Sequence, residues 1–351
     1  MFMKENLTQT APLTPPDAGH LVDIRHEKLS FFTPAGEVKA LNDVSLFLKP
    51  GEILGIVGES GSGKSVTAYS LMGLTAYPGK LIGGDLWFNG KHINDMTEKD
   101  FRKMRGNEVS IIFQDPMTSL NPVYTIGNQI REVIRLHTDK TKEEVNARAL
   151  ELLKLVGINE PEKRLKQYPH ELSGGMRQRV MIAIALACEP KLLIADEPTT
   201  ALDVTIQAQI LELMMELKKK LDMAIILITH DLGVVAGTCD RIAVMYAGQI
   251  VECGTTDEIF YHPSHEYTKG LIASIPKLNE FDHVRLVPIE GTPVDLLNPP
   301  KGCPFAPRCK QCMKICLREM PKFRDLSESH TSRCWLLDKA ELEAEKEEKE
   351  V

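Results

Sequence analysis

The chain has 351 residues, of which 43% are hydrophobic, and it carries a formal net charge of −7. This length accommodates about two domains with a sizeable core. An acidic balance without a long basic run argues against nucleic acid as the main partner. No stretch reaches the roughly 18 consecutive apolar residues that a membrane-spanning helix needs, and the polar N-terminus has no apolar core that would predict export.

The first part of the chain predicts a polar tail followed by strands. Residues 1–20 contain several prolines and are expected to be disordered. Apolar, strand-like runs follow at residues 21–24, 29–33, 38–48 and 53–57, with turns at Gly36-Glu37 and Pro50-Gly51. Residues 66–74 then predict a helix, residues 85–88 a short strand, and Asn89-Gly90 a turn.

The middle of the chain alternates between strand-like and helix-like segments. Residues 109–113 predict a buried strand, and the pattern is helical from residue 125 to residue 172. Within that stretch, a Thr-x-x-Glu start at Thr141 and a stop at Gly157 delimit one helix. The apolar runs at 191–195 and 223–229 are typical of parallel strands covered on both faces. The alternation predicts an α/β core over residues 21–260, with a helical subdomain at about 116–172.

The character of the sequence changes after about residue 260. Proline becomes frequent, periodicity fades, and five of the eight cysteines crowd between Cys303 and Cys334. These features predict a small, irregular C-terminal extension over residues 261–337. The remaining residues, 338–351, form a charged run that is expected to be a solvated helix or to fray.

An eight-residue segment, GESGSGKS at residues 58–65, fits the phosphate-loop pattern G-x-x-x-x-G-K-[ST] between a strand and a helix. Its glycines let backbone N–H groups approach phosphate oxygens, and the following helix adds its positive end. Lys64 is expected to reach the β- and γ-phosphates, and the Ser65 hydroxyl to hold Mg²⁺. An ordinary glycine turn is the alternative. The predicted nucleotide contacts are Gly58, Ser60, Gly61, Ser62, Gly63, Lys64, Ser65 and Val66.

Two downstream features supply further parts of a nucleotide hydrolase. Asp196-Glu197 ends the strand-like run LLIA, which places one carboxylate where it can hold Mg²⁺ and the next where it can activate water. Ser173-Gly174-Gly175 opens a helix and predicts a second anion-binding turn. A solvated turn and a plain helix cap are the respective alternatives.

These segments occur in one order: GESGSGKS, IIFQDP with Gln114, LSGGM, LLIADEP, the segment ending at Asp203, and LITHD with His230. As an ordered set they resemble the ATP-binding subunits of ATP-binding-cassette (ABC) transporters, which have a P-loop NTPase core. The resemblance implies that ATP and Mg²⁺ are bound, that Asp196 and Gln114 join Ser65 in the Mg²⁺ shell, and that Glu197 is the general base.

The same resemblance assigns the remaining site residues. His230 resembles the switch histidine that contacts the γ-phosphate, and Gln114 is also expected to sense the membrane partner. Ser173, Gly174 and Gly175 resemble the signature loop, which binds the γ-phosphate held by the opposite subunit. Asp203 resembles the residue that crosses the dimer interface. Met176 departs from the family, in which many signature loops have glutamine. Adenine is expected to stack on one of two aromatic residues, Phe31 or Phe32.

The cysteine cluster suggests a metal centre. Thiolates select zinc or an iron–sulfur cluster, and spacing alone does not decide between them. The segments HPSHEYTKGLIASIP and GCPFAPRC resemble the C-terminal extension of the dipeptide and oligopeptide permease ATPases. That resemblance implies a structural [4Fe–4S] cluster that leaves Cys312 spare, with Zn²⁺ or reduced thiols as alternatives. The implied ligands are Cys303, Cys309, Cys316 and Cys334.

The resemblance implies an ATPase subunit that powers import of dipeptides or oligopeptides from the cytoplasmic face of the cell membrane. It implies a second, identical or homologous ATPase subunit, two membrane permease subunits and, indirectly, an extracytoplasmic solute-binding protein. Residues 115–127 resemble the surface that receives a membrane subunit. Nickel or another small solute is the alternative cargo. A soluble cassette ATPase of DNA repair, translation or iron–sulfur assembly is the alternative class.

Overall fold

The computed structural model describes residues 16–17, 19–115, 119–200, 202–275 and 288–339. Most of the expected N-terminal tail and most of the charged run at 338–351 lie outside these residues. In the part of the chain that is described, no helix combines the length and the hydropathy needed to cross a bilayer.

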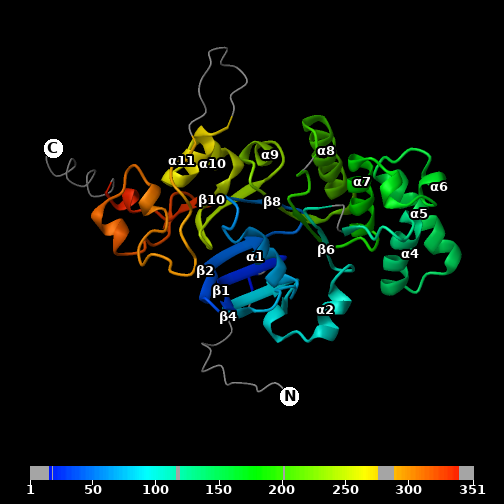
Figure 1. The fold of residues 1–351 in the computed structure, drawn as a ribbon, viewed down its shortest axis with the longest axis horizontal. Coiled ribbons are helices and arrows are strands. Elements are labelled where there is room, and N and C mark those ends of the chain that lie inside the picture. The colour runs from blue at the N-terminus through cyan, green and yellow to red at the C-terminus, as the bar shows by residue number, and fades with distance from the viewer. Residues whose placement is uncertain (1–15, 18, 116–118, 201, 276–287, 340–351) are drawn as a thin grey trace, which may run out of the picture.

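A small antiparallel sheet has the strand order β2-β1-β4-β5 among the described residues (Figure 1). Its strands are β1 (Val22–Thr33), β2 (Gly36–Leu48), β4 (Gly79–Phe88) and β5 (Lys91–His92). The sequence predicts two strands where the structure has the single strand β1, because bulges between Ile24 and Ser30 interrupt the alternation without ending the pairing. The predicted turn at Asn89-Gly90 is confirmed, since both residues have positive φ, 48° and 73°.

The larger sheet has the order β11-β12-β10-β9-β3-β8-β7-β6 among the described residues. Four parallel neighbours form its centre and one flank, namely β3 (Ile53–Val57), β8 (Ala224–Thr229), β7 (Leu192–Asp196) and β6 (Val109–Ile112). On the other flank, β9 (Arg241–Tyr246) is parallel to β3, and β10 (Gln249–Thr255) is antiparallel to β9. The prediction of buried parallel strands is therefore confirmed.

Both faces of the central strands are covered, which explains their continuous apolar sequences. Along β8, Ile225 and Leu227 pack into one hydrophobic core, whereas Ile226 and Ile228 pack into another. The first core includes the helices that follow β6 and β7, and the second includes the small sheet and the helix after β3. Alternation between two cores, rather than between core and solvent, therefore determines this pattern.

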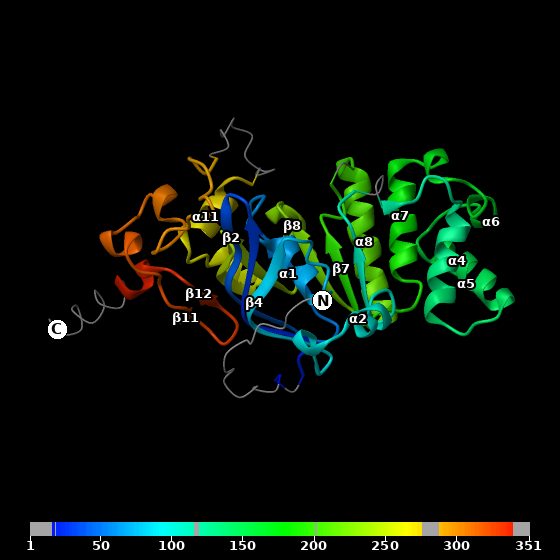
Figure 2. The same ribbon diagram turned by 60° about the horizontal axis from the view of Figure 1, so that its bottom comes forward.

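The helices are placed between strands, as the alternation predicts. They are α1 (Lys64–Leu71), α2 (Glu98–Met104), α4 (Ile126–His137), α5 (Lys142–Leu155), α6 (Pro161–Arg164), α7 (Gly174–Ala185), α8 (Val204–Leu221), α9 (Leu232–Ala236), α10 (Thr256–Tyr261) and α11 (Glu266–Ala273). The predicted helix start at Thr141 is confirmed by a capping box with Glu144. Helices α4 to α7 gather at one end of the molecule (Figure 2).

The C-terminal region, residues 288–339, lies at the opposite end and is mostly irregular (Figures 1 and 2). Its strands β11 (Arg324–Asp325) and β12 (Thr331–Ser332) extend the larger sheet, because β12 pairs with β10. A buried carboxylate fixes this junction: Glu252 on β10 accepts hydrogen bonds from the backbone N–H groups of Ser264 and His265 and lies 2.8 Å from Nε2 of His330. The C-terminal region is thus part of the larger sheet, through the pairing of β12 with β10 and the contact between His330 and Glu252.

Candidate functional site

The predicted phosphate loop connects β3 to α1 in a conformation that requires glycine. Gly58 has φ +157°, and a Cβ there would lie 2.1 Å from the carbonyl oxygen of Met245. Gly63 caps α1 with φ +103° and lies against Leu41 and Met245. Ser62 is buried, and its Oγ has no hydrogen-bond partner in the described structure. The loop is therefore a close-packed backbone turn with an unsatisfied hydroxyl group.

Lys64, the predicted phosphate ligand, folds back over this loop. Its Nζ donates to the carbonyl oxygens of Gly58, at 2.7 Å, and Glu59, at 2.9 Å. Burial lowers the pKa of Lys64, and the nearby carboxylates of Glu197, Asp196 and Glu59 oppose that shift. The lysine is thus held at the loop by neutral acceptors that a phosphate group could replace.

The predicted Mg²⁺ ligands Ser65 and Asp196 lie together, although 131 residues separate them. Ser65 Oγ donates to Asp196 Oδ1 at 2.9 Å, and the Tyr69 hydroxyl donates to Oδ2 at 2.8 Å. Burial at the end of β7 raises the pKa of Asp196, and both hydrogen bonds counteract this. The sequence patterns did not predict a role for Tyr69. Its position one helical turn after Ser65, on the same face of α1, is the signal that could have identified it.

Glu197, the predicted general base, is the meeting point of three strand ends. Its Oε2 accepts hydrogen bonds from Gln114 Nε2 at 2.9 Å and from Thr200 Oγ1 at 3.0 Å, and its Oε1 lies 3.2 Å from His230 Nδ1. Gln114 follows β6 and His230 follows β8, so the sheet brings all three predicted residues together. Glu197 has φ +47°, a strained conformation for a non-glycine residue of the kind that clusters at functional sites. Thr200 was not predicted.

The predicted signature loop has a different surrounding. Ser173 caps α7, its Oγ accepting from the backbone N–H of Met176, and Gly174 is exposed. A Cβ on Gly175 would lie 2.9 Å from Ile206 of α8, whose N-terminal cap is Asp203. The predicted dimer residues therefore lie on neighbouring helices, α7 and α8, and α7 belongs to the helical end rather than to the neighbourhood of α1 (Figure 2).

The two candidate adenine partners differ in exposure. Phe31 is half-buried and approaches Gly79 of β4, whereas Phe32 is 46% exposed and lies under the ammonium group of Lys80. Val66, the last predicted contact of the loop, is half-buried on α1.

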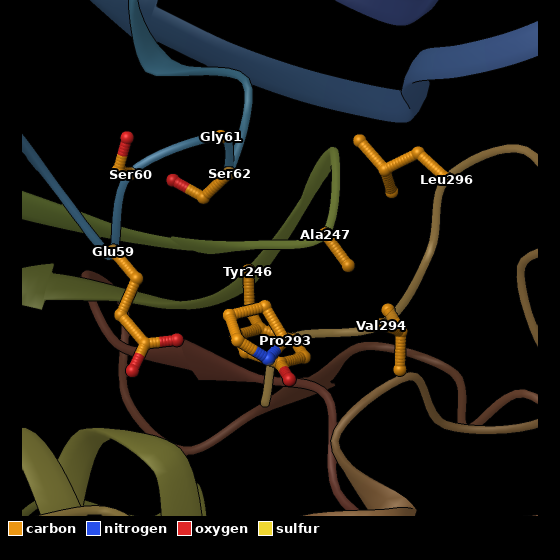
Figure 3. A pocket seen from close by; sticks show the side chains of 9 residues that line it. All are labelled: Glu59, Ser60, Gly61, Ser62, Tyr246, Ala247, Pro293, Val294 and Leu296. Carbon is orange, nitrogen blue, oxygen red and sulfur yellow. The ribbon is translucent and has the colours of Figure 1, made fainter. Parts of the chain in front are cut away.

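A pocket beside the phosphate loop is shared with the C-terminal region (Figure 3). The loop contributes Ser60 and Gly61 among others, and the turn after β9 contributes Ala247. The facing wall is a segment of the C-terminal region, which presents Pro293, Val294 and Leu296. This segment is fixed by the backbone, since the Lys39 N–H of β2 donates to the Leu296 carbonyl at 3.0 Å. Sequence analysis did not predict that residues so late in the chain reach the loop.

The four cysteines predicted as metal ligands line one pocket, together with Phe305 and Trp335. They are Cys303, Cys309, Cys316 and Cys334. Cys312 is exposed and is not part of that lining. Burial raises the pKa of Cys303 to about 12 and that of Cys309 to about 11. None of the eight cysteines, all of which lie among the described residues, forms a disulfide bond.

Comparisons with known proteins agree with this architecture. A family model described as "ABC transporter" matches residues 41–200, and one described as "Oligopeptide/dipeptide transporter, C-terminal region" matches residues 251–316. The chain is 57% identical to the oligopeptide transport ATP-binding protein OppD of Bacillus subtilis, over 90% of this chain and 89% of that protein. It is 53% identical to the dipeptide transport ATP-binding protein DppD of the same organism, over 91% of this chain and 95% of that protein.

Solved structures show the same core. The dimeric ATP-binding cassette MJ0796, bound to ADP and Pi in a post-hydrolysis state, has a TM-score of 0.61 and 29% identity, covering 67% of this chain and 98% of that one. The protein cbiO1 of Clostridium perfringens, part of an ABC transporter complex, has a TM-score of 0.61 and 30% identity, covering 70% of this chain and 92% of that one. The chain therefore belongs to the family of ABC-transporter ATPases that includes the oligopeptide and dipeptide transport ATP-binding proteins.

Proposed function

We propose that this ATPase powers the import of dipeptides or oligopeptides. The observation that carries the proposal is the arrangement around Glu197, with Gln114 and His230 against its carboxylate, beside the pair formed by Ser65 and Asp196. Similarity to OppD and DppD over about nine-tenths of the chain supports peptides as the cargo.

The loop and its neighbours fit ATP and Mg²⁺. The buried Ser62 hydroxyl lacks a partner, and Lys64 is held by two carbonyl groups that cannot neutralise its charge. The oxygens of Ser65 and Asp196 are hard ligands of the kind that Mg²⁺ prefers. A bound Mg²⁺ would neutralise the negative charge that develops on the phosphate groups during hydrolysis. Ser65, Asp196 and Gln114 are the residues proposed to hold it.

The residues around Glu197 are proposed to hydrolyse the nucleotide. The Glu197 carboxylate takes a proton from the attacking water, and the amide of Gln114 orients both groups. His230 is 59% exposed and can swing from Glu197 to the γ-phosphate. Adenine is proposed to stack on Phe31 or Phe32.

The signature loop is proposed to complete the site of a second ATPase subunit. Ser173, Gly174 and Gly175 would bind the γ-phosphate held by the partner, with Asp203 at the same interface. The partner is an identical or a homologous chain. The pair is proposed to contact two membrane permease subunits, with residues near Gln114 receiving them, and to serve an extracytoplasmic solute-binding protein indirectly. The chain is accordingly proposed to act at the cytoplasmic face of the membrane.

The cysteine pocket is proposed to hold a [4Fe–4S] cluster. Among the described residues, the only three metal-ligand atoms within 4.8 Å of one another belong to Asp17, His20 and Asp23, so no three thiol sulfurs are that close. Zinc bonds of about 2.3 Å would hold four sulfurs roughly 3.8 Å apart. Four thiols that line one pocket, with Cys312 outside the lining, support the proposal that these four residues would hold the cluster. Zn²⁺ is the alternative.

Two other functions use the same site. The ATPase itself does not select the cargo, so nickel or another small solute is the alternative within the family. A soluble cassette ATPase is the alternative outside it. The match to the oligopeptide/dipeptide C-terminal region argues against the latter.

Isolation of the membrane assembly tests the proposed function. We expect the chain to purify with two membrane subunits and a second ATPase, and we expect peptide-loaded binding protein to stimulate ATP hydrolysis. A parallel assay with nickel-loaded binding protein serves as the control. Stimulation by nickel alone, or purification without membrane subunits, would contradict peptide import.

Anaerobic purification tests the metal. A [4Fe–4S] protein is brown, and the colour should survive Cys312→Ser and disappear in Cys316→Ser. Colourless protein with one bound zinc per chain would reverse the assignment.

A further inference from the structure

Glu59, the second residue of the phosphate loop, is held by the C-terminal region. Its carboxylate forms a two-pronged ion pair with Arg308, whose Nη1 lies 2.6 Å from Oε2 and whose Nη2 lies 2.9 Å from Oε1. Parallel hydrogen bonds of this kind fix both distance and orientation. The Arg308 side chain is only 3% exposed, so solvent screens the pair weakly. No motif of the ATPase core requires this contact, and 249 residues separate its partners.

The backbone of Glu59 is fixed as well. Its N–H donates to the hydroxyl oxygen of Tyr267, on α11, at 2.9 Å. Its carbonyl oxygen accepts from Lys64 Nζ, also at 2.9 Å. The same carbonyl also accepts from the Ser62 N–H within the loop, at 3.2 Å. Every polar group of Glu59 is therefore hydrogen-bonded, and residues beyond the core strands hold both its carboxylate and its N–H. Only the bond from Lys64 has to break when that lysine turns toward a phosphate group.

Arg308 is itself held by several hydrogen bonds, so it can fix the position of the Glu59 carboxylate. Its Nε donates to the Glu290 carbonyl at 3.0 Å, and its Nη2 donates to the Ile289 carbonyl at 3.2 Å. Its Nη1 lies 3.3 Å from the Tyr246 hydroxyl, at the end of β9. A guanidinium group held by three other acceptors has little freedom to follow a moving partner. It serves as a fixed point for the loop.

We propose that Arg308 and Tyr267 are positioning residues for nucleotide binding, because they hold Glu59 so that the phosphate loop keeps its shape when Lys64 releases it. The inference rests on the proposed ATP site at Lys64. It makes the C-terminal region a working part of that site: it supplies both an anchor and, through Val294 and Leu296, a wall beside the loop (Figure 3).

Calorimetric titration of the full chain with ATP and Mg²⁺ tests this proposal. Arg308→Gln should weaken ATP binding roughly tenfold, the loss typical of a charge-assisted bond, and Tyr267→Phe a few-fold. At saturating ATP the hydrolysis rate of both variants should recover, because the groups around Glu197 are untouched. Arg308→Lys should remain impaired, since an ammonium group cannot form the two-pronged pair.

The matched control is Arg333→Gln. Arg333 is a half-buried arginine of the same region, and its side chain pairs with Asp43 on β2 at 3.1 Å rather than with a residue of the loop. It should lower the midpoint of thermal unfolding without changing the ATP dissociation constant. Equal ATP affinity in Arg308→Gln and wild type would overturn the inference, as would an equal affinity loss in Arg333→Gln. If Arg308→Gln fails to fold, Tyr267→Phe and Glu59→Gln provide the same comparison.

Lys64→Ala separates this inference from the proposed function. If Lys64→Ala loses ATP binding while Arg308→Gln and Tyr267→Phe retain it, the ATP site stands and the anchoring role is wrong. If Lys64→Ala binds ATP as tightly as wild type, the site itself is misassigned.

Discussion

The phosphate-loop half and the signature half of this ATPase are built in different ways. In the first, residues from four strand ends already contact one another: Ser65 bonds to Asp196, and Gln114 and His230 meet at Glu197. In the second, Ser173 and Asp203 only cap their own helices, and Gly174 is exposed.

Only the phosphate-loop half is fully assembled within a single chain. A preassembled set of hydrogen-bonded side chains needs only its ligand, whereas an exposed helix N-terminus is a surface that can bind an anion brought by another molecule. The proposed division of labour follows: each chain binds ATP with its own loop and completes its partner's site with its own signature. Substitutions in the two halves should therefore differ in kind.

Glu197→Gln should have the largest effect. Removal of the proposed general base should lower the hydrolysis rate by about 10²- to 10⁴-fold, while ATP still binds the intact loop. Unhydrolysed ATP should also hold two chains together, which size-exclusion chromatography would detect as an ATP-dependent dimer. Turnover at the wild-type rate in this variant would remove the basis for the role of Glu197.

Ser173→Ala should separate binding from turnover. The isolated chain should bind ATP with unchanged affinity, because Ser173 is remote from its own loop, yet hydrolysis should fall by roughly 10- to 100-fold through loss of a bond to a charged group. Calorimetry and a steady-state phosphate-release assay give the two numbers. Weaker ATP binding by the dilute chain would mean that the two halves are not independent.

Glu27→Gln should change how the free energy of unfolding depends on pH. Glu27 is fully buried in β1, and burial raises its pKa to about 8 from an ordinary value of 4.5. Between these values the folded chain holds a proton that the unfolded chain releases, so stability falls as pH rises, by about 1.4 kcal/mol per pH unit for one such group. The variant should lose this dependence, and its unfolding midpoint should exceed that of wild type more at pH 8 than at pH 5. An unchanged pH dependence would show that Glu27 ionises normally.

Tyr69→Phe should have the smallest effect. It removes one hydrogen bond from Asp196, worth about 1 kcal/mol, and so should weaken Mg²⁺-dependent ATP binding roughly fivefold. Since that bond counteracts the raised pKa of Asp196, its loss should raise this pKa further. The acid limb of the activity profile should then move to higher pH. A limb that stays in place would exclude Asp196 as the titrating group.

The sequence predicted the phosphate-loop half well because its residues follow strands. Parallel strands end at one edge of a sheet, so Gln114, Glu197 and His230 had to converge once β6, β7 and β8 were recognised. The same reasoning could not find Thr200 or Tyr69, whose roles depend on rotamers and on which helix face meets the sheet.

The contacts that the C-terminal region makes with the core could not be predicted from sequence patterns. The pair of Glu59 and Arg308 spans 249 residues and belongs to no periodic pattern. β12 has two residues, too few for alternation to appear. Two strands were predicted where the structure has only β1. The reason is that bulges in β1 interrupt the alternation of side chains, although the hydrogen-bonded pairing with β2 continues.

The pairing of β12 with β10 bears on any attempt to study the catalytic core alone. A fragment ending near residue 260 would uncover the rim of the larger sheet at Glu252 and Cys253, where Ser332 and Thr331 now pair. It would also remove the imidazole of His330 and the two backbone N–H groups that bond to the Glu252 carboxylate. Unprotected sheet rims recruit foreign strands. Self-association of such a fragment would therefore result from the loss of β12 at the edge of the sheet, and not from the dimerisation proposed for the intact ATPase.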